Sequence, residues 1–386
     1  MQCLASRLCL SYKREMIMPP QIIVLFSGGL DSLLAAQLLQ RQGLSVRCLH
    51  FVSPFFGSPD AVAQWRTLHG LDIVSMDIGE QFATLLTRRP EHGFGKVLNP
   101  CVDCKILQLR IARQYMEAVG AQAVATGEVL GQRPMSQRRD TLNLIMREAG
   151  VADILLRPLC ALKLAPTPVE VCGLVDRSRL LGIWGRGRRE QLALAQEYGL
   201  AAIPTPAGGC RLTERENARR YWMILTRVSR PSNADFALAN LGRQCWYETE
   251  NANYWLSVGR NSEDNKNLAV AVRPGDVILE LRDIPGPLAL ARHGAAWPED
   301  VLSSAAAHAV SYAPKAVATG APVAVLVRCQ ETLREICVLP QRCRQMWGEP
   351  AWDAIKPLLR AEARERQAAQ DVSRHGSGAG HWTPRA

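Results

Sequence analysis

The sequence predicts an α/β fold, a doubly wound and mostly parallel sheet, followed by a smaller α+β domain. From Gln21 to Pro206, short apolar runs alternate with segments of helical periodicity, which is typical of parallel strands joined by helices. The first apolar run ends in a Ser-Gly-Gly turn that leads directly into a helix. From about Trp246 the pattern changes to short strands, Gly and Pro turns and one Ala-rich helix at 299–313, which predicts the second domain.

The chain has 386 residues, of which 47% are hydrophobic and 21% charged, so it is long enough for two or three domains. Its net charge of +10 permits a polyanionic partner. Residues after about 362 are small, polar or charged, and we expect this tail to be disordered. The predicted organisation is an N-terminal extension (1–20), a first domain (21–206), a basic connector (207–245), a second domain (246–345) and a C-terminal segment (346–386).

The sequence predicts a cytoplasmic protein. No apolar run approaches the length of a membrane span, so no membrane association is expected. The apolar stretch near Leu8 is too weak for a signal peptide, which leaves Met16 or Met18 as an alternative start. The twelve cysteines are scattered over a long chain, so most are expected to be reduced. The oligomeric state is left open.

Five short apolar runs are the candidate strands of the first domain. A helix with Leu107, Ile111, Tyr115 and Val119 on one stripe is expected between the third run and the fourth. Ligands of such sheets bind at the carboxyl ends of the strands. The candidate strands are 22–26, 45–51, 72–78, 122–126 and 153–156.

The stretch Ser-Gly-Gly-Leu-Asp-Ser, residues 27–32, follows the first candidate strand. Gly28 and Gly29 allow a tight turn, and the helix that follows begins with Leu30, Asp31 and Ser32. A strand, a glycine turn and a helix start leave several backbone N–H groups unbonded at one point, which favours an anion there. The alternative is a plain turn with a glycine hinge.

Three cysteines stand in loops rich in Gly, Pro or polar residues. Cys101 and Cys104 form a Cys-x-x-Cys at the expected start of the Leu107 helix, where the helix dipole favours a thiolate. Such a pair serves as a redox pair or as half of a zinc or iron–sulfur site. The sequence lacks a second pair at zinc spacing, and the nearest candidate third ligand is Cys210 in PTPAGGCRLT.

Two further loops carry polar residues near the expected strand ends. Thr126 and Gly127 end the fourth candidate strand, and the side chains that follow are expected beside the same edge of the sheet: Glu128, Gln132, Arg133, Ser136 and Gln137. A polar surface loop is the alternative. The second loop contains Arg186, Arg188 and Arg189, which either bind phosphates or form a solvated basic turn.

Residues from about 20 to 225 resemble the PP-loop ATP pyrophosphatases, the adenine nucleotide α-hydrolase superfamily. The motifs SGGLDS, NPCVDCK, ATGEVLGQRPMSQ and GRGRREQ…PTPAGGCRLT are similar in order to those of tRNA thiouridylase-like members, the 4-thiouridine synthases and 2-thiouridylases. The resemblance implies a Rossmann-like sheet and an ATP site with Asp31 near Mg²⁺. Arg211 departs from the pattern, which has a hydrophobic residue beside the cysteine. The implied ATP contacts are Ser27, Gly28, Gly29, Asp31, Ser32, Thr126, Gly127 and Gln132.

This resemblance implies an ATP-dependent sulfurtransferase that adenylates a uridine carbonyl oxygen in tRNA or another structured RNA and replaces it with sulfur. Asp31, Cys101, Cys104 and Cys210 would be catalytic, and Arg186, Arg188 and Arg189 would bind RNA. The cysteines either carry and resolve a persulfide or hold a [4Fe–4S] cluster, and a cysteine desulfurase or sulfide would supply the sulfur. The alternatives are nitrogen insertion, removal of sulfur, or a nucleotide-sensing RNA-binding protein without catalysis.

Residues 254–290 resemble the R-type RNA-binding domain of NFACT ribosome-quality-control proteins. The resemblance rests on Val258-Gly-Arg-Asn261, Asn265, Asp276 and Pro285-Gly286, and it implies RNA contacts by Arg260 and Asn261. Glu280 and Pro287 depart from the family pattern, which has histidine and serine there.

Overall fold

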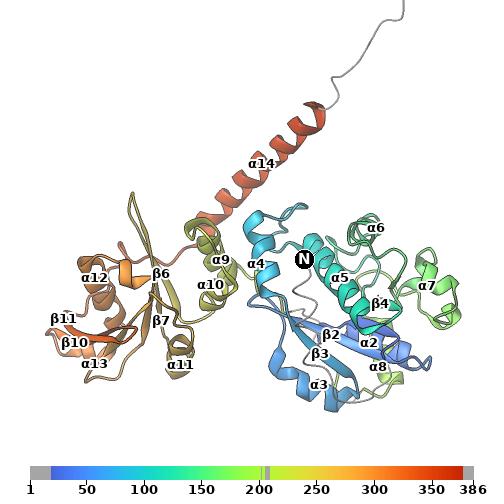
Figure 1. Ribbon diagram of the computed structural model, residues 1–386, viewed down its shortest axis with the longest axis horizontal. Helices are drawn as coiled ribbons and strands as arrows, with labels where there is room; N and C mark the ends of the chain where they lie inside the picture. Colours follow the sequence, from blue (N-terminus) through green and yellow to red (C-terminus); the bar gives the residue numbers. More distant parts are fainter. Residues whose placement is uncertain (1–18, 201, 205–208, 377–386) are drawn as a thin grey trace, which may run out of the picture. The chain divides into compact units, whose positions relative to one another are not determined.

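The computed structural model describes residues 19–200, 202–204 and 209–376 (Figure 1). The chain divides into two compact units, each described by itself: the first comprises 1–52, 57–77 and 101–208, and the second 53–56, 78–100 and 209–386. Residues 1–18 of the expected N-terminal extension, and 205–208 of the PTPAGGC loop, lie outside the described residues. No helix in the described ranges is long and apolar enough to cross a bilayer.

The first unit is built on a five-stranded parallel sheet of order β3-β2-β1-β4-β5. The chain winds outward from β1 to β3 on one side and then continues to β4 and β5 on the other, so the order reverses between β1 and β4. In doubly wound sheets this switch point is where ligands bind. The predicted fold class is confirmed. The strands are β1 (Ile22–Leu25), β2 (Val46–Val52), β3 (Asp72–Asp77), β4 (Ala123–Thr126) and β5 (Leu155–Leu156).

Helices connect these strands, as the alternating pattern predicted. β1, β4 and α2 are almost wholly buried, which explains why their sequences are apolar without alternation. The helices of this unit are α2 (Leu30–Gln40), α3 (Val62–His69), α5 (Cys101–Val119), α6 (Arg139–Glu148), α7 (Pro168–Val171) and α8 (Arg189–Glu197).

The helix expected after the third strand is α5, but its buried face differs from the predicted stripe. Leu107, Ile111, Tyr115 and Val119 are only partly buried. The sequence carries two overlapping apolar stripes, and packing against the rest of the unit selects the second one. Its buried apolar residues are Val102, Ile106, Leu109, Ala112 and Met116.

The second unit is built on a six-stranded antiparallel sheet of order β11-β10-β8-β9-β7-β6. Its core combines the apolar face of this sheet with α12 and with Trp347, which is 1% exposed. The expected boundary at 246 falls inside the first strand of this sheet. The strands are β6 (Arg243–Glu248), β7 (Asn253–Val258), β8 (Val277–Leu281), β9 (Ala289–Arg292), β10 (Val323–Cys329) and β11 (Thr332–Val338).

Helices of the second unit include the Ala-rich helix that the sequence predicted at 299–313. They are α4 (Gly79–Arg88), α9 (Arg215–Arg227), α10 (Asn233–Leu238), α11 (Ser262–Val270), α12 (Glu299–Val310), α13 (Pro314–Ala318) and α14 (Trp352–Gly376). Helix α14 extends past residue 362, where the sequence predicted disorder. Its Ala, Glu, Arg and Gln residues favour helix as well as polarity.

The segment expected as a basic connector is folded within the second unit. Helix α9 is buried on all sides over its second half, where Tyr221 and Trp222 stand among six consecutive buried residues, 220–225. Its arginines lie close to acids: Arg219 bonds Glu349 at 3.2 Å, and Arg227 pairs with Glu248 at 3.0 Å. Spacing in the sequence does not reveal these partners.

Candidate nucleotide site

The turn between β1 and α2 is held by its two serines. The backbone N–H of Ser27 donates to Ser32 Oγ at 3.2 Å, and Ser32 Oγ donates to the Gly29 carbonyl at 2.8 Å. Gly29 is the N-cap of α2, and no side chain caps this helix start. The serines therefore shape the turn, while the first N–H groups of α2 are left to an anion, which the helix dipole also favours.

Gly28 is required twice over. Its φ of +78° lies in the left-handed region, and a Cβ there would lie 2.4 Å from the Trp65 ring. Trp65 packs edge-on against Phe26 and His50, at centroid distances of 5.5 and 5.1 Å. This aromatic cluster packs against the turn and restricts its movement.

His50 locks the same turn through both ring nitrogens. Nδ1 lies 2.8 Å from the Phe26 carbonyl, and Nε2 accepts from the Ser58 N–H at 3.0 Å. This pair of partners requires a neutral ring with its proton on Nδ1. Burial lowers the pKa of His50, and its hydrogen bond to Phe26 opposes that shift only in part.

The end of β4 packs directly on the start of α2. A Cβ on Gly127 would lie 2.5 Å from the carbonyl carbon and oxygen of Asp31 and 2.6 Å from the Ser32 nitrogen. Thr126, the last residue of β4, is 1% exposed. The structure thus brings together the Ser-Gly-Gly turn and Thr126-Gly127 at the switch point of the sheet.

Asp31 is held through one oxygen only. Its Oδ2 accepts from Gln132 Nε2 at 3.1 Å and lies 3.5 Å from Arg188 Nη2. Its Oδ1 is buried without a hydrogen-bond partner, and so is Oε1 of Gln132. A buried acceptor without a partner costs about 1–3 kcal/mol, and oxygens of this type are the ligands that Mg²⁺ prefers. This donor set fits a magnesium ion.

The loop after Gly127 differs in part from the expectation. Glu128 does not project over the strand ends: it is 3% exposed and pairs with the buried Arg157 at 3.1 Å. Burial raises the pKa of Glu128, but the charges of Arg157 and Lys105 outweigh burial and lower it. Gln137 is also buried, with Oε1 unpartnered. Glu128 is therefore an ionised structural residue, while Gln132 reaches Asp31.

The arginine loop lies against this same segment. Leu130 and Trp184 form a parallel bridge, and the Gly185 N–H donates to the Leu130 carbonyl at 2.7 Å. Arg188 faces Asp31, whereas Arg186 and Arg189 are exposed. Arg188 therefore lies beside the candidate nucleotide site, and RNA binding by Arg186, Arg188 and Arg189 stays a prediction.

The three predicted cysteines occupy loops and helix starts. Cys101 is the first residue of α5 and Cys104 lies in its first turn, as the sequence predicted. Cys210 precedes the short 3₁₀ helix at Arg211–Thr213 and belongs to the second unit. Their roles remain predictions.

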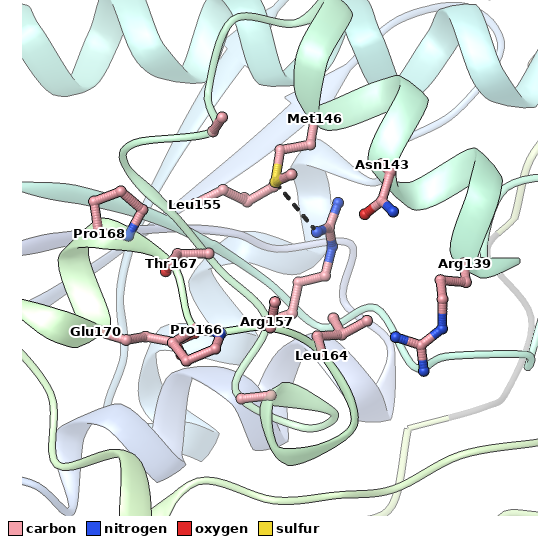
Figure 2. A pocket seen from close by; sticks show the side chains of 13 residues that line it. Arg139, Asn143, Met146, Leu155, Arg157, Leu164, Pro166, Thr167, Pro168 and Glu170 are labelled. Carbon is pink, nitrogen blue, oxygen red and sulfur yellow. Dashed lines mark hydrogen bonds between the residues drawn. The ribbon is translucent and has the colours of Figure 1, made fainter.

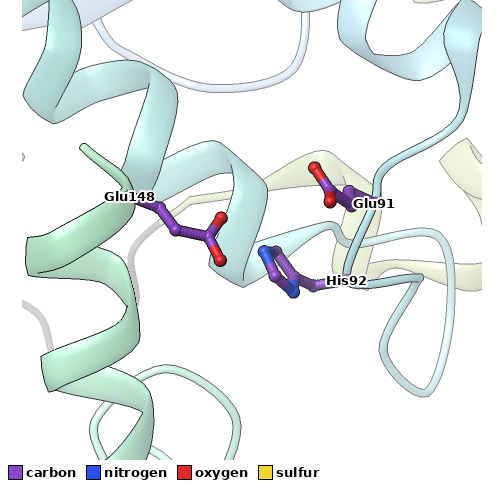
Figure 3. Close-up of side chains that lie close together, drawn as sticks. All are labelled: Glu91, His92 and Glu148. Atoms are coloured by element: carbon purple, nitrogen blue, oxygen red, sulfur yellow. The ribbon is translucent and has the colours of Figure 1, made fainter. Parts of the chain in front are cut away.

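Figure 3 draws three further side chains of metal-ligating type: Glu91 and His92, which follow α4, and Glu148, the last residue of α6. Glu91 and His92 belong to the second unit and Glu148 to the first, so they are assigned to no common site.

The first unit also contains a small cleft of about 170 Å³ beside α6 (Figure 2). Its arginines are already engaged: Arg157 bonds Glu128 and the Leu142 carbonyl, and Arg139 donates to the Lys163 carbonyl. We assign it no ligand.

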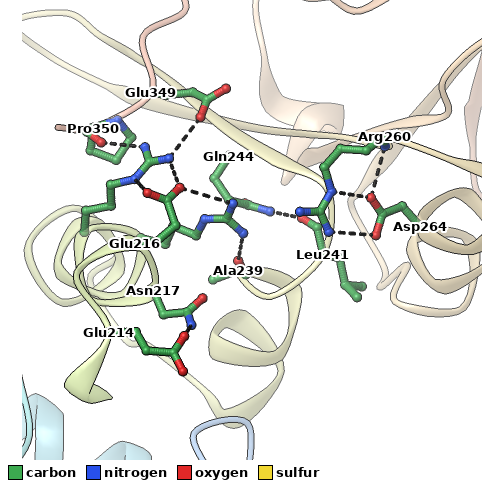
Figure 4. A network of polar contacts seen from close by, with 12 residues as sticks. Glu214, Glu216, Asn217, Ala239, Leu241, Gln244, Arg260, Asp264, Glu349 and Pro350 are labelled. Atoms are coloured by element: carbon green, nitrogen blue, oxygen red, sulfur yellow. Dashed lines mark hydrogen bonds and ion pairs between the residues drawn. The ribbon is translucent and has the colours of Figure 1, made fainter. Parts of the chain in front are cut away.

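In the second unit, the predicted RNA contacts line a wider groove of about 720 Å³. Asn261 is the N-cap of α11, with its Oδ1 accepting from the Asp264 N–H at 2.8 Å. Arg260 forms a two-pronged pair with Asp264, at 2.6 and 3.2 Å (Figure 4). Tyr312 lies between the guanidinium groups of Arg243 and Arg342, at 4.4 and 4.0 Å.

Sequence reasoning missed several buried or partly buried residues of the first unit. Trp65 and His50 brace the turn, and Arg157 neutralises Glu128. Gln191 on α8 is fully buried, and neither end of its amide has a hydrogen-bond partner among the described residues. A glutamine at an otherwise apolar helix position was the available signal for Gln191, whereas the partners of Trp65 and Arg157 depend on the folded topology.

Two comparisons with known proteins match the first part of the chain. The family model of the thiamine biosynthesis protein ThiI matches residues 19–165. The tRNA-specific 2-thiouridylase MnmA of Desulfosudis oleivorans is 30% identical over 119 residues, which cover 28% of this chain and 32% of that protein. The chain thus spans about a third of the length of this curated relative. Residues 19–165 form a domain of the PP-loop, tRNA thiouridylase-like superfamily, which confirms the first resemblance.

Solved structures give more distant likenesses. The U34-tRNA thiolase NcsA from Methanococcus maripaludis, solved with its [4Fe-4S] cluster, is 17% identical with a TM-score of 0.29, over 49% of this chain and 60% of that one. The C-terminal part of the fibronectin/fibrinogen-binding protein from Streptococcus suis is 17% identical with a TM-score of 0.24, over 36% of this chain and 63% of that one.

Proposed function

We propose that this protein is an ATP-dependent sulfurtransferase that thiolates a uridine in tRNA. The observation that carries the proposal is Asp31. In the Ser-Gly-Gly-Leu-Asp-Ser turn, at the switch point of a PP-loop domain, it keeps one buried carboxylate oxygen unpartnered. The ThiI and MnmA matches support sulfur transfer to tRNA as the reaction.

The chain's own residues would act first on the nucleotide. The uncapped N–H groups at the start of α2 would bind the β- and γ-phosphates, and Gly127 allows the end of β4 to approach them. Asp31 Oδ1 and Gln132 Oε1 would hold Mg²⁺, which when bound neutralises charge on the leaving pyrophosphate. Arg188, 3.5 Å from Oδ2, would keep Asp31 oriented.

The chemistry addresses a poor leaving group. A uridine carbonyl oxygen attacks the α-phosphorus of ATP, pyrophosphate leaves, and the oxygen is now part of an AMP ester. A sulfur nucleophile then adds to the uracil ring carbon that carries this oxygen, and AMP departs with the original oxygen. The base must leave its stack to reach the site, which is consistent with a basic chain.

The sulfur would be handled by Cys101, Cys104 and Cys210. Two arrangements remain: a persulfide on one cysteine that another resolves, or a [4Fe–4S] cluster whose open iron binds sulfide. We propose the cluster, because the resemblance to the thiouridylases implies a Cys-x-x-Cys and one distant loop cysteine as its three ligands; Cys101 and Cys104 lie at the start of α5 in the first unit, and Cys210 lies in the second. Free sulfide would be the donor for the cluster, whereas the persulfide pair would need a cysteine desulfurase, which delivers sulfur already at the persulfide level.

The second unit would contribute RNA binding. Its groove at the β8–β9 side carries Arg243 beside the exposed backbone of Pro285-Gly286, which suits a phosphate chain. Arg260 and Arg282 also line it, but they are paired with Asp264 and with Asp283 and Glu335, so phosphate would have to compete with these acids. The R-type resemblance supports this role for Arg260 and Asn261.

The test is single-turnover formation of AMP and thiolated nucleoside on unmodified tRNA, with Mg²⁺, ATP and sulfide, under anaerobic conditions. Asp31→Asn should lower the rate of AMP formation by about 10³-fold, since a lost metal ligand removes several kcal/mol of charge stabilisation. Asp140→Asn is the matched control: Asp140 is also a first-turn aspartate, on α6, and pairs only at the exposed surface with Arg138.

Mass spectrometry of the nucleosides separates the alternatives. Thiolated uridine supports the proposal, an amine in place of the carbonyl indicates nitrogen insertion, and loss of sulfur from a thiolated tRNA indicates the reverse activity. AMP formation by Asp31→Asn at the wild-type rate would refute the role of the turn.

A further inference from the structure

One aromatic side chain stands out against the rest of the molecule. The chain has nine tryptophans, and of those that the structure describes only Trp184 is exposed, at 67% of its surface. The others are buried or partly buried, and Trp382 lies outside the described residues. An indole ring left in water gives up a large apolar contact area, so its exposure calls for a partner.

Trp184 is exposed although its backbone is fixed. Ile183, directly before it, is 3% exposed, and its N–H donates to the Leu159 carbonyl at 2.9 Å. Trp184 itself bridges Leu130, and the Gly185 N–H donates to the Leu130 carbonyl at 2.7 Å. The ring is therefore presented by a rigid loop, which lowers the entropy cost of binding to it.

This loop belongs to the nucleotide site. Arg188, four residues after Trp184, lies 3.5 Å from Asp31, and four residues span at most about 14 Å. Leu130, on the other side of the bridge, is two residues from Gln132, which bonds the same carboxylate. The ring is thus held near the point where a target base would be activated.

Positive charge follows Trp184 along the same segment. Arg186 and Arg189 are exposed, and no ion pair that the structure describes includes either of them. Glu190, in the first turn of α8, is the nearest acid in sequence. An exposed π-face with two exposed guanidinium groups two and five residues further along matches an unpaired nucleotide, which offers a ring for stacking and phosphates beside it.

We infer that Trp184 is a stacking platform for an unpaired base of the RNA substrate, with Arg186 and Arg189 binding the flanking phosphates. This inference rests on the proposed function, since it names how the substrate is held beside the nucleotide site. A base next to the extruded uridine loses its own stacking partner, and the indole ring replaces it.

The experiment measures binding of the full chain to a single-stranded oligouridine, to an RNA duplex of equal length and to unmodified tRNA. Trp184→Ala should weaken single-strand binding by about 5- to 150-fold, the range of measured base–aromatic stacking. Trp184→Phe should restore most of it. Duplex binding should be unchanged, because paired bases offer no free face.

Two controls separate stacking from charge and from folding. Arg186→Gln and Arg189→Gln should each weaken single strand and duplex alike and reduce the salt slope by about 0.7–1. Val171→Ala, another exposed apolar side chain at 75%, should change nothing. Titration with ATP in the absence of RNA should give the same affinity for Trp184→Ala as for the wild-type chain, which shows that the nucleotide site is intact.

The outcomes are distinguishable from those of the proposed function. If the wild-type chain binds RNA and Trp184→Ala binds every probe equally well, the platform is refuted and the sulfurtransferase proposal stands. If the wild-type chain binds no RNA at all, the RNA substrate of the proposed function fails and the platform fails with it.

Discussion

The two units treat their buried polar atoms differently. In the first unit, three unpartnered oxygens share one region: Asp31 Oδ1, Gln132 Oε1 and Gln137 Oε1 lie on the start of α2 and the loop after β4. Other unpartnered atoms of this unit, such as Gln37 Oε1 and Thr167 Oγ1, lie on separate elements. In the second unit, charged groups mostly close on one another. Arg292, 3% exposed, meets Asp276 at 2.6 Å and Asp235 at 3.4 Å.

The same contrast appears in the network around α9, where Arg219 bonds Glu216 and Glu349 and Arg260 bonds Asp264 (Figure 4). The second unit also has unpartnered atoms, such as Arg220 Nε and Trp246 Nε1, but they lie singly on different elements. A buried group without a partner is costly, so a cluster of them at a switch point indicates a ligand, whereas closed pairs indicate structure.

The largest expected effect concerns the three predicted cysteines, of which two belong to the first unit and one to the second. If they hold a [4Fe–4S] cluster, anaerobic protein should be brown, absorb near about 400 nm and contain about four irons per chain. Cys101→Ser, Cys104→Ser and Cys210→Ser should each abolish the colour. Cys172→Ser, at an exposed site in the first unit, should keep it.

Iron analysis and absorption spectra check this prediction before any activity is measured. A colourless, iron-free protein that still thiolates tRNA would exclude the cluster and favour the persulfide pair.

The next prediction contrasts pH effects. Burial lowers the pKa of His308 to about 4, and Arg342 and Arg344 add to this. The folded state therefore prefers neutral His308. The folded state keeps its full stability at this residue above about pH 6.5, and the free energy of unfolding decreases as the pH falls towards 4. The loss amounts to about 3 kcal/mol. Trp347, whose ring lies 6.4 Å from His308, provides a fluorescence signal for unfolding.

His50 in the first unit shifts in the same direction, so both units should become less stable in acid. Thermal unfolding from about pH 7.5 to about pH 4.5, with NMR titration of the imidazoles, tests this. A His308 resonance that titrates above its ordinary value would contradict the prediction.

A smaller effect is expected from the contact between β4 and α2. Gly127→Ala would place a Cβ 2.5 Å from the Asp31 backbone, so it should destabilise the first unit by about 1–3 kcal/mol and weaken ATP binding. Gly187→Ala is matched: Gly187 has an ordinary φ and nothing within 4 Å of its added Cβ. Denaturant unfolding and ATP titration measure the stability and the ATP affinity of both variants. Equal values for the two variants would show that β4 can shift away from α2 to accommodate the Cβ.

Sequence predicted the local features of the first unit well. The β1 strand, the glycine turn and the start of α2 follow from neighbouring residues, and so do the alternation that sets the parallel sheet and the position of Cys101 at a helix start. Features that depend on distant partners were missed. Glu128 pairs with Arg157, 29 residues later, and the stripe on α5 is chosen by packing.

In the second unit, the arginines of α9 predicted a basic connector because their acidic partners, Glu349 among them, lie far along the chain. The sequence shows which charged residues the chain contains, but only the folded structure shows which of them are already paired and which can contact RNA. This distinction also applies to Arg260 and Asn261, whose RNA contacts remain a prediction.

The smallest effect tests that distinction at Asn261, which caps α11 through Oδ1. Asn261→Ala should cost about 1 kcal/mol of stability, whereas Asn267→Ala, on the exposed face of the same helix, should cost nothing because alanine favours helix. Asn261→Ser keeps a capping oxygen and so should keep the stability, but it removes the amide donor. If Asn261 also contacts RNA, Asn261→Ser should lower RNA affinity by about 2- to 10-fold, one hydrogen bond's worth. Unfolding curves and tRNA titrations of all three variants decide the matter. If Asn261→Ser binds RNA with wild-type affinity, Asn261 acts only as a helix cap. RNA binding in this unit would then depend on arginines that are not paired with acidic side chains.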